Sequence, residues 1–365
     1  MSNATLTTGS GISNLDYLSN SYDNESSWIL LGKKEFGAGA TVEVDEESGD
    51  VVGLSFRFSR IVDQLEGPFP VSLGSLTSLQ VLDLRKCSGI TSLPESIGSL
   101  SQLKKIDLRR CEGLKTLPNT IGQLQALKEL DMSDCINISS LPESIGNVSS
   151  LTKFVIGGSG ITSGNKVLHS LPDSFCKLTN LVELDLSKCK ELQALPENIG
   201  NLNALRELHM RECRCLTQLP ESIGNLKSLH ELSLSKCVGL TSLPESIGFL
   251  SSLDDLNLVK CKSIITLPSG IGQLTTLVSL NLRGCKSLQE IPDCIENLLS
   301  LKKLDLSECK NITFLPEVIG KLTSLRSLSV EKCPALNDMP ASAFWLKSVT
   351  MGWPKSDNND NNACE

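Results

Sequence analysis

Aromatic side chains are scarce in this sequence, at 4% of 365 residues. Hydrophobic residues still make up 40%, so a folded core has to be built mainly from aliphatic side chains. Positive charge is also in deficit, because the formal net charge is −8 at pH 7. A protein that binds nucleic acid carries a surplus of basic residues on its binding surface. An anionic membrane would repel a chain of negative net charge. We therefore expect neither nucleic acid nor membrane among the partners.

Targeting signals are missing as well. The first 20 residues are polar and lack the basic start and apolar run of a signal peptide. No apolar run approaches the roughly 20 residues that a membrane-spanning helix needs. We therefore expect a cytoplasmic protein whose fourteen cysteines stay reduced as thiols.

A period of 24 residues organises most of the chain. Twelve of the fifteen prolines follow this spacing, with a single step of 30 between Pro142 and Pro172. Ten cysteines, from Cys87 to Cys333, keep the same period. One unit, beginning at Leu79, reads L-x-x-L-x-L-x-x-C-x-x-I-x-x-L-P-x-x-I-G-x-L. Repetition at a fixed period is the signature of a solenoid, in which each coil buries its apolar side against its neighbours.

Each part of the unit predicts a local structure. The second and third leucines alternate with Asp83 and Arg85, which is the period-2 pattern of a strand with one buried face. Pro94 predicts a turn on the outer side of the coil. Gly98 predicts a residue with positive φ before the chain returns to the next strand. Stacked coils of this kind align their strands into one parallel sheet.

The motif L-x-x-L-x-L-x-x-C-x-x-L-x-x-L-P resembles the leucine-rich repeats of plant intracellular immune (disease-resistance) receptors and, more loosely, those of the Ras-group leucine-rich-repeat proteins. The resemblance covers about residues 51–346. It implies an α/β fold: a leucine-rich-repeat solenoid, or horseshoe, with a parallel concave sheet, short helical or irregular convex segments and about 12 repeats. Plant immune receptors also carry a nucleotide-binding switch domain. This chain has no G-x-x-x-x-G-K-[ST] loop, so their switch mechanism is not carried over.

The ends of the chain depart from the repeat. Aromatic residues gather near the C-terminus at Phe344, Trp345 and Trp353, which fits a cap over the apolar end of a solenoid. The expected organisation is a disordered tail over 1–25, an N-terminal cap and first atypical repeat over 26–76, repeats over 77–340 with an insertion at 157–168, a C-terminal cap over 341–354 and a disordered tail over 355–365.

The periodic cysteines are the most prominent candidates for chemistry. A metal array or a disulfide ladder is one interpretation of such a column. Zinc needs four ligands that converge tetrahedrally, and a straight column does not converge. The other interpretation is that each thiol is a small buried group in the slot that Asn often fills in this motif, donating a weak hydrogen bond to a neighbouring carbonyl. We adopt this second interpretation and predict no metal site and no cofactor.

Histidines and aspartates of the predicted strands are the other candidates for chemistry. His209 and His230 fall in consecutive repeats and form either a small pH-responsive or metal-binding pair or ordinary surface residues. Asp83, Asp107 and Asp131 form a column that could hold a general acid and base, but an open sheet without an enclosed pocket favours a solvated polar ladder. The chain contains no recognisable nucleophile and base pair. We therefore predict that it is not an enzyme.

The exposed positions of the concave sheet form the predicted binding surface. The first two cysteine-containing repeats concentrate six cations there, and like charge is costly unless a partner compensates it. The alternative is a solvated face that Asp83 and Asp107 partly neutralise. The six predicted partner-binding residues are Arg85, Lys86, Lys104, Lys105, Arg109 and Arg110. Further candidates on this face are Asp83, Asp107, Asp131, His209, Arg211 and His230.

These observations predict a non-enzymatic protein-interaction module whose partner is acidic at the contact. The resemblance places such a module in plant defence or intracellular signalling. The exposed strand positions carry no aromatic residue, so binding would depend on arginine and on shape. The alternative function is a receptor for a small anionic ligand near Arg85, Lys86, Arg109 and Arg110. The insertion at 157–168 is either a tolerated loop or part of the binding side.

Overall fold

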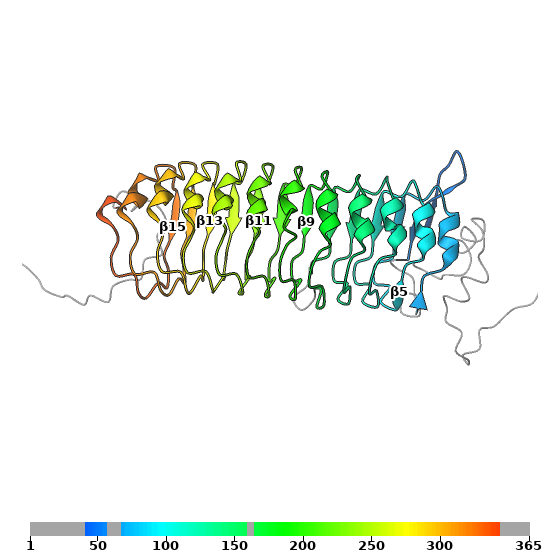
Figure 1. The fold of residues 1–365 in the computed structure, drawn as a ribbon, viewed down its shortest axis with the longest axis horizontal. Helices are drawn as coiled ribbons and strands as arrows, with labels where there is room; N and C mark the ends of the chain where they lie inside the picture. Colours follow the sequence, from blue (N-terminus) through cyan, green and yellow to red (C-terminus); the bar gives the residue numbers. More distant parts are fainter. Residues whose placement is uncertain (1–40, 57–66, 159–163, 344–365) are drawn as a thin grey trace, which may run out of the picture. The chain divides into compact units, whose positions relative to one another are not determined.

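The computed structural model describes residues 41–56, 67–158 and 164–343. The chain divides into two compact units, Met1–Leu178 and Thr179–Glu365, and each is described by itself. In both units the chain winds through successive coils, each with a short strand and a short helical turn (Figure 1). The predicted tails and most of the predicted C-terminal cap, including Phe344, Trp345 and Trp353, lie outside the described residues.

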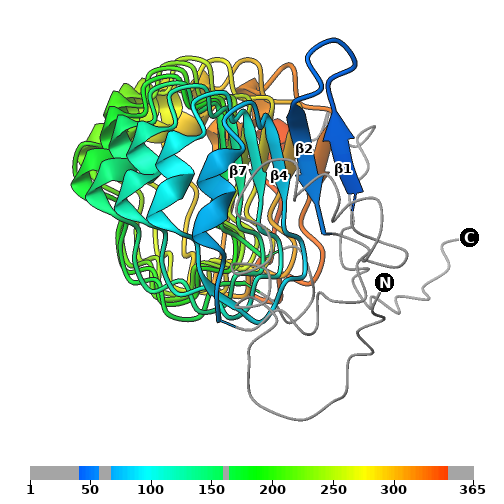
Figure 2. The same ribbon diagram turned by 90° about the vertical axis from the view of Figure 1, so that its right-hand side faces the viewer.

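The first unit is built on one sheet of mainly parallel strands, several of which are visible in one layer in Figure 2. A hairpin begins it, because β1 pairs with β2 in the antiparallel sense, and β2 then pairs with β4 in parallel. A separate pair, β3 with β5, lies outside this sheet. The strands are β1 (Thr41–Val44), β2 (Val51–Ser55), β3 (Gly67–Pro68), β4 (Val81–Asp83), β5 (Ile90–Ser92), β6 (Lys105–Asp107), β7 (Glu129–Asp131) and β8 (Lys153–Val155).

Over its described residues the second unit contains seven parallel strands, each paired with the next in sequence. The register follows the period, since Leu208 lies opposite Leu232 and Leu232 opposite Leu256. The predicted leucine-rich-repeat fold with a 24-residue period is thereby confirmed. The strands are β9 (Glu183–Asp185), β10 (Glu207–His209), β11 (Glu231–Ser233), β12 (Asp255–Asn257), β13 (Ser279–Asn281), β14 (Lys303–Asp305) and β15 (Ser327–Ser329).

The helical segments are short 3-10 turns. Each one except η7 follows a periodic proline in extended conformation, such as Pro94 with φ −73° and ψ 151°. The fixed φ of proline suits this entry, and its missing N–H costs no ladder bond. The turns are η2 (Val71–Ser75), η3 (Glu95–Ser99), η4 (Asn119–Gln123), η5 (Glu143–Asn147), η6 (Asp173–Lys177), η7 (Ile199–Asn201), η8 (Glu221–Asn225), η9 (Glu245–Phe249), η10 (Ser269–Gln273), η11 (Asp293–Asn297) and η12 (Glu317–Lys321).

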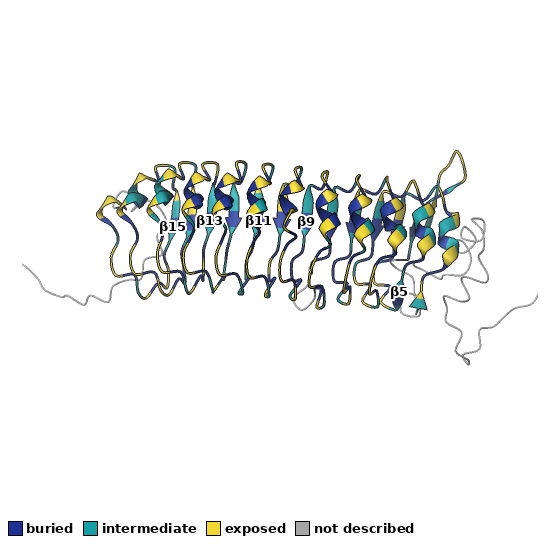
Figure 3. Cartoon of the chain, viewed as in Figure 1, coloured by how far each residue is buried: buried dark blue, intermediate teal, exposed yellow. Residues whose placement is uncertain are grey.

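An aliphatic core fills the inside of each coil, as the composition predicted. The leucines at the middle of β4 and directly after it, Leu82 and Leu84, have no exposed surface. Exposed residues gather on the helical turns and loops, while the parallel strands of the sheet combine a buried central residue with neighbours of mostly intermediate exposure (Figure 3). Aromatic pairs fill two places in the first unit, with ring centroids 5.9 Å apart for Phe56 and Phe69 and 5.1 Å apart for Phe154 and Phe175.

Ten of the strands are followed, three residues beyond their ends, by a residue with positive φ that directly precedes a periodic cysteine. Such a conformation normally favours glycine, but among these ten residues only Gly284, with φ 73°, is a glycine. The other nine are charged. The coil therefore imposes the left-handed conformation on side chains that do not prefer it, at a cost of about 1–3 kcal/mol each. The other residues of this kind are Lys86, Arg110, Asp134, Lys188, Glu212, Lys236, Lys260, Glu308 and Lys332.

The predicted role of Gly98 is wrong. Its φ is not positive, and it lies inside η3. A Cβ at Gly98 would come within 2.3 Å of the Gln123 side chain of the next coil, and one at Gly122 within 2.4 Å of the Ser144 backbone oxygen. Glycine is therefore used at this position because consecutive helical turns approach closely. Close approach and positive φ select the same residue type, so the sequence did not distinguish them.

Carboxylates also join consecutive helical turns. The Glu95 side chain accepts hydrogen bonds from the backbone N–H groups of Asn119 and Thr120, at 3.3 and 3.1 Å. Glu245 does the same for Ser269 and Gly270, at 3.3 and 2.7 Å. These N–H groups open a helical turn and lack a partner within it, so each glutamate satisfies donors of the following coil.

We expect Gly122→Ala to lower the free energy of unfolding by about 1–3 kcal/mol, because the added methyl group meets the Ser144 backbone oxygen rather than a flexible side chain. Urea denaturation of the full chain measures this. Gln123→Ala, a change at the exposed neighbouring position, is the control and should stay within about 0.5 kcal/mol of the wild type. Equal effects of the two changes would contradict the close-approach explanation.

Candidate functional site

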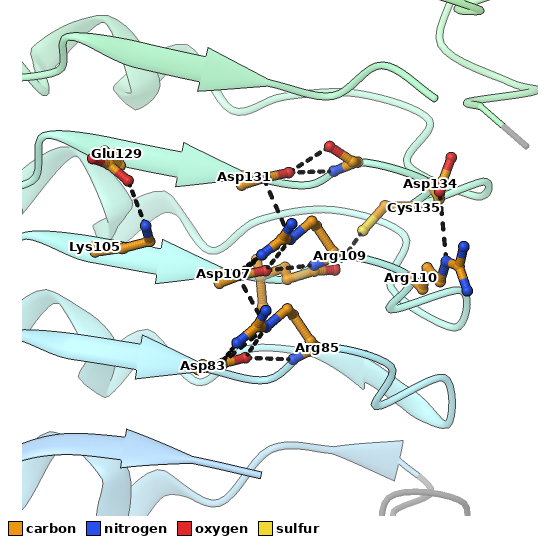
Figure 4. Close-up of polar contacts among 12 residues, drawn as sticks. Asp83, Arg85, Lys105, Asp107, Arg109, Arg110, Glu129, Asp131, Asp134 and Cys135 are labelled. Carbon is orange, nitrogen blue, oxygen red and sulfur yellow. Dashed lines mark hydrogen bonds and ion pairs between the residues drawn. The ribbon is translucent and has the colours of Figure 1, made fainter. Parts of the chain in front are cut away.

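The exposed sheet face of the first unit carries an alternating row of acids and arginines. Register places Asp83 beside Asp107 and Asp107 beside Asp131, one on each of β4, β6 and β7. Arg85 and Arg109 follow two residues after the first two of these aspartates, on the same side of the chain. We call these five residues the ladder (Figure 4).

Each arginine of the ladder joins two strands. Arg85 Nε donates to Asp83 Oδ1 at 2.8 Å and lies 3.2 Å from Asp107 Oδ2. Arg109 Nε donates to Asp107 Oδ1 at 3.0 Å, and its Nη2 donates to Asp107 Oδ2 at 2.7 Å. Arg109 Nε also lies 3.5 Å from Asp131 Oδ2. A planar guanidinium matched to a carboxylate in this two-pronged way is held in a fixed orientation.

The carboxylates of the ladder are well covered by these arginines. Burial alone would raise the pKa of Asp83, but hydrogen bonds from the side chain and backbone of Arg85 outweigh it and bring the pKa below its ordinary value. The same contact with Asp83 raises the pKa of Arg85. The Asp107 side chain is only 4% exposed. The ladder is therefore a charge-paired polar layer on the sheet, and Asp83, Asp107 and Asp131 belong to it.

The other predicted cations have separate surroundings. Lys105 Nζ lies 2.7 Å from Glu129 Oε2, and Lys104 Nζ donates to Gln80 Oε1 at 2.9 Å. Arg110 lies 3.6 Å from Asp134, beyond the end of β6. Lys86 is exposed, also beyond its strand and with positive φ.

The six predicted cations thus do not form one cluster of unbalanced charge. Like-charge repulsion is not what distinguishes this surface, because carboxylates already compensate Arg85, Lys105, Arg109 and Arg110. The arginines of the ladder are held in place before any partner arrives. A surface that is ordered in advance loses less conformational entropy on binding.

A depression of about 260 Å³ lies beside the ladder. It spans β6, β7 and β8, and three cations and three carboxylates contribute to its wall. Its lining residues are Lys105, Asp107, Arg109, Glu129, Leu130, Asp131 and Lys153. The sequence did not indicate that Lys153 and Glu129 line this depression, because the register of β7 and β8 is what brings these two residues together.

The three remaining candidates lie in the second unit. His209, at the end of β10, has Nε2 3.4 Å from Glu207 and Nδ1 3.6 Å from Glu231. His230 precedes β11, and its Nδ1 lies 2.7 Å from the Ser228 carbonyl oxygen. The register pairs His209 with Ser233, so the two histidines occupy different positions of their coils. Arg211 lies 3.4 Å from Glu212.

The periodic cysteines are buried free thiols. Cys111 Sγ donates to the Leu84 carbonyl at 3.1 Å, and Cys261 Sγ to that of Leu234 at 3.0 Å. Burial raises the pKa of Cys87 and Cys135 to about 12, which keeps these thiols protonated at neutral pH. The predicted thiol-to-carbonyl contact is confirmed. Within the described ranges, no group of three or more His, Cys, Asp or Glu side chains could hold a metal ion.

The insertion contains a structural residue that the sequence reading missed. Asn165 is fully buried, and its Nδ2 donates to the carbonyl oxygens of Cys135 and Ile138, at 3.1 and 2.7 Å. Its Oδ1 accepts from the backbone N–H groups of Val167 and Leu168. Asparagine often takes the slot that cysteine fills in this motif, and that was the available signal. Ser159, the predicted counterpart of the periodic cysteine, lies outside the described residues.

Comparison with known proteins identifies the family. A family model described as a leucine-rich repeat region matches residues 55–167 and 234–344, and a second, described as Leucine Rich Repeat, matches 180–202. These segments cover more than half of the sequence, so the chain belongs to the leucine-rich-repeat proteins. No curated protein matches it. In the part of the chain that is described, no helix combines the length and the apolar character needed to cross a bilayer.

Three solved structures illustrate what the chain is similar to. A chain of the Drosophila Toll–Spätzle complex is 20% identical, with a TM-score of 0.53, over 73% of this chain and 40% of that chain. A leucine-rich-repeat protein of Leptospira interrogans is 25% identical over 82% of this chain and 89% of its own, with a TM-score of 0.43. The Arabidopsis receptor kinase HAESA, solved with the peptide hormone IDA, is 22% identical over 83% and 57%, with a TM-score of 0.48.

We expect iodoacetamide at pH 8 to modify Cys215 and Cys294 first among the described cysteines, because these two are partly exposed while the periodic thiols are buried, and burial also raises the pKa of Cys87 and Cys135. Peptide mass spectrometry after timed labelling measures this, and the urea-denatured chain is the control in which all cysteines react. Labelling of Cys111 as fast as Cys215 in the native chain would contradict the buried column.

The ladder should make stability depend on pH. The folded pKa of Asp83 is lowered, so its contribution is present above the unfolded pKa of about 3.9 and is lost as pH falls through the folded value. We expect Asp83→Asn to lower the free energy of unfolding by about 1–2 kcal/mol at pH 7. Below about pH 4 the variant should lose less stability than the wild type as the pH falls. Urea denaturation midpoints across this pH range measure both effects.

The control for this change is Asp305→Asn. Asp305 occupies the same strand position in the second unit, but its Oδ1 accepts from the backbone of Ser307 rather than from an arginine. An equally flattened pH profile for Asp305→Asn would show that the arginine contact is not the cause.

Proposed function

We propose that this chain is a non-enzymatic module that binds a protein partner on the exposed sheet face of its first unit, centred on the ladder and the neighbouring depression. The leucine-rich-repeat fold is a common protein-interaction fold and typically a non-enzymatic binding scaffold. The observation that carries the proposal is the ladder itself, a set of arginines held across strands by aspartates on an accessible face.

An acidic contact is supported by the net charge of this sheet face, counted with the ladder residues included. The sheet-face segments 80–86, 104–110, 128–134 and 152–157 hold eight cations and five carboxylates, a surplus of three positive charges in an acidic chain. The seven equivalent segments of the second unit, from 182–188 to 326–332, hold ten of each sign, with histidine counted as neutral. Lys104 and Lys128, both exposed at the same position of consecutive coils, are the proposed contacts for acidic groups.

The proposed cellular role rests on the repeat motif of the sequence. Its resemblance to the repeats of plant intracellular immune receptors supports a role in plant defence or intracellular signalling, in the cytoplasm. The Drosophila chain of similar fold was solved as part of a complex of Toll with Spätzle, which is consistent with a protein partner.

The alternative of a small anionic ligand has less support from the geometry. The depression contains Asp107, Glu129 and Asp131 beside its cations, so an anion would meet carboxylates as well. Its volume of about 260 Å³ lies below the range of about 300–1,000 Å³ that is usual for small-molecule pockets. A side chain of a protein partner fits these conditions better than a separate charged ligand.

The test is capture of partners from native extract by the full chain, followed by titration of each purified partner. Lys104→Glu combined with Lys128→Glu should weaken binding on the order of tenfold or more, since two attractive contacts become repulsive. Lys302→Glu combined with Arg326→Glu reverses two cations at the same coil position in the second unit and is the matched control. Binding that is weakened equally by both pairs, or by neither, would contradict the proposed face.

A further inference from the structure

Arg109 has the same bonding pattern as Arg85, but its side chain is more exposed, at 42% against 20%, and it lines the depression. Its Nε and Nη2 both bond to Asp107, and its Nε also faces Asp131. Guanidinium hydrogens lie in the plane of the group, so these bonds occupy one edge of that plane. The two aspartates therefore leave the flat faces and the remaining terminal nitrogen of the group unused.

A partner carboxylate is a poor match for these unused parts of the guanidinium. It would approach a cation whose charge two aspartates already compensate, in a hollow that Glu129 also lines. Like charges at such separations repel, and the low exposure of Asp107 reduces the solvent that would screen them. An aromatic ring brings no charge into the hollow, and it stacks on a guanidinium face without displacing the bonds at the edge.

The sheet face itself supplies no such ring. Among the described strands, no Trp, Tyr or Phe takes an exposed position, and Phe154 on β8 is buried. Interfaces draw most of their binding energy from tyrosine, tryptophan and arginine, and these anchors tend to pair across the contact. With the arginine on this side, the aromatic residue has to come from the partner.

We propose that the partner segment places an aromatic side chain, preferably tyrosine, in the depression against the guanidinium of Arg109, with its acidic residues beside Lys104 and Lys128. This inference rests on the proposed function and specifies its partner chemistry. The tyrosine hydroxyl donates a hydrogen bond to one of the carboxylates lining the hollow. The lysines precede their strands while Arg109 follows β6, so acidic and aromatic residues of the partner contact opposite ends of the strands, roughly 15 Å apart.

The experiment uses the full chain and three small probes: N-acetyl-tyrosinamide, N-acetyl-leucinamide and the α-amide of N-acetyl-aspartate. The arginine Nε–Hε signals are recorded by NMR during each titration, and the signal lost in Arg109→Lys assigns Arg109. Arg283 is the matched control. It is 49% exposed and paired with Glu308 at 2.6 Å, but it lies in the second unit and outside the depression.

We expect the tyrosine probe to shift the Arg109 signal saturably, with an affinity about twofold to fivefold above that of the other two probes, and to leave Arg283 unchanged. Asp131→Asn, which keeps an oxygen for the Ser133 N–H while removing one negative charge, should narrow the preference for tyrosine over aspartate. Tighter binding of the aspartate probe, equal shifts at Arg283, or no saturable shift at Arg109 would overturn the inference.

The two proposals can fail separately. A partner that depends on Lys104 and Lys128 while Arg109 shows no preference for the aromatic probe leaves the binding face in place and removes the aromatic contact. An aromatic preference at Arg109 together with a partner that ignores Lys104 and Lys128 removes the acidic contact instead.

Discussion

Hydrogen bonds from one coil to its neighbours are the constraint on which the rest of the structure depends. The thiol of a periodic cysteine donates to a carbonyl 27 residues earlier, as Cys285 does to Leu258. The backbone N–H just before a periodic cysteine donates forward to the next coil, as Arg110 does to Ser133 at 2.8 Å. A coil therefore cannot satisfy its own polar groups, and its stability comes mainly from its nearest neighbours.

The surface chemistry follows from the same register. Because strands pair without offset, an aspartate at the end of one strand lies beside the aspartate at the end of the next. Those equal charges would repel, and arginines two residues further along lie between them and compensate both. The repeat period thus places the aspartates side by side, and the arginines of the ladder compensate their repulsion. The ladder also leaves ordered cations on an accessible face, which is the property that a binding surface needs.

The leucine and proline spacing was sufficient to predict the fold, because few structures bury a side chain every second or third residue at a strict 24-residue period. The cysteine contacts followed from the same spacing. Three features did not. Gly98 was assigned to the wrong cause, positive φ was found on charged residues such as Lys86 that do not favour it, and the contacts of Arg85 and Arg109 depend on side-chain directions that a residue list does not contain.

One consequence concerns how such a chain can change in length. Within a unit, the carbonyls of Leu234, Leu258 and Leu282 receive the thiols of Cys261, Cys285 and Cys309 in the same way. These coils are therefore interchangeable. After the loss or duplication of 24 residues, the same thiol-to-carbonyl hydrogen bonds form with the adjacent coil. A gain within the strand or the thiol position would misalign donors and acceptors along the stack. The six extra residues between Pro142 and Pro172 avoid this, because Asn165 still donates to a carbonyl 27 residues earlier. The length of the chain can thus change where these interior bonds are kept, while the exposed side chains can vary one at a time.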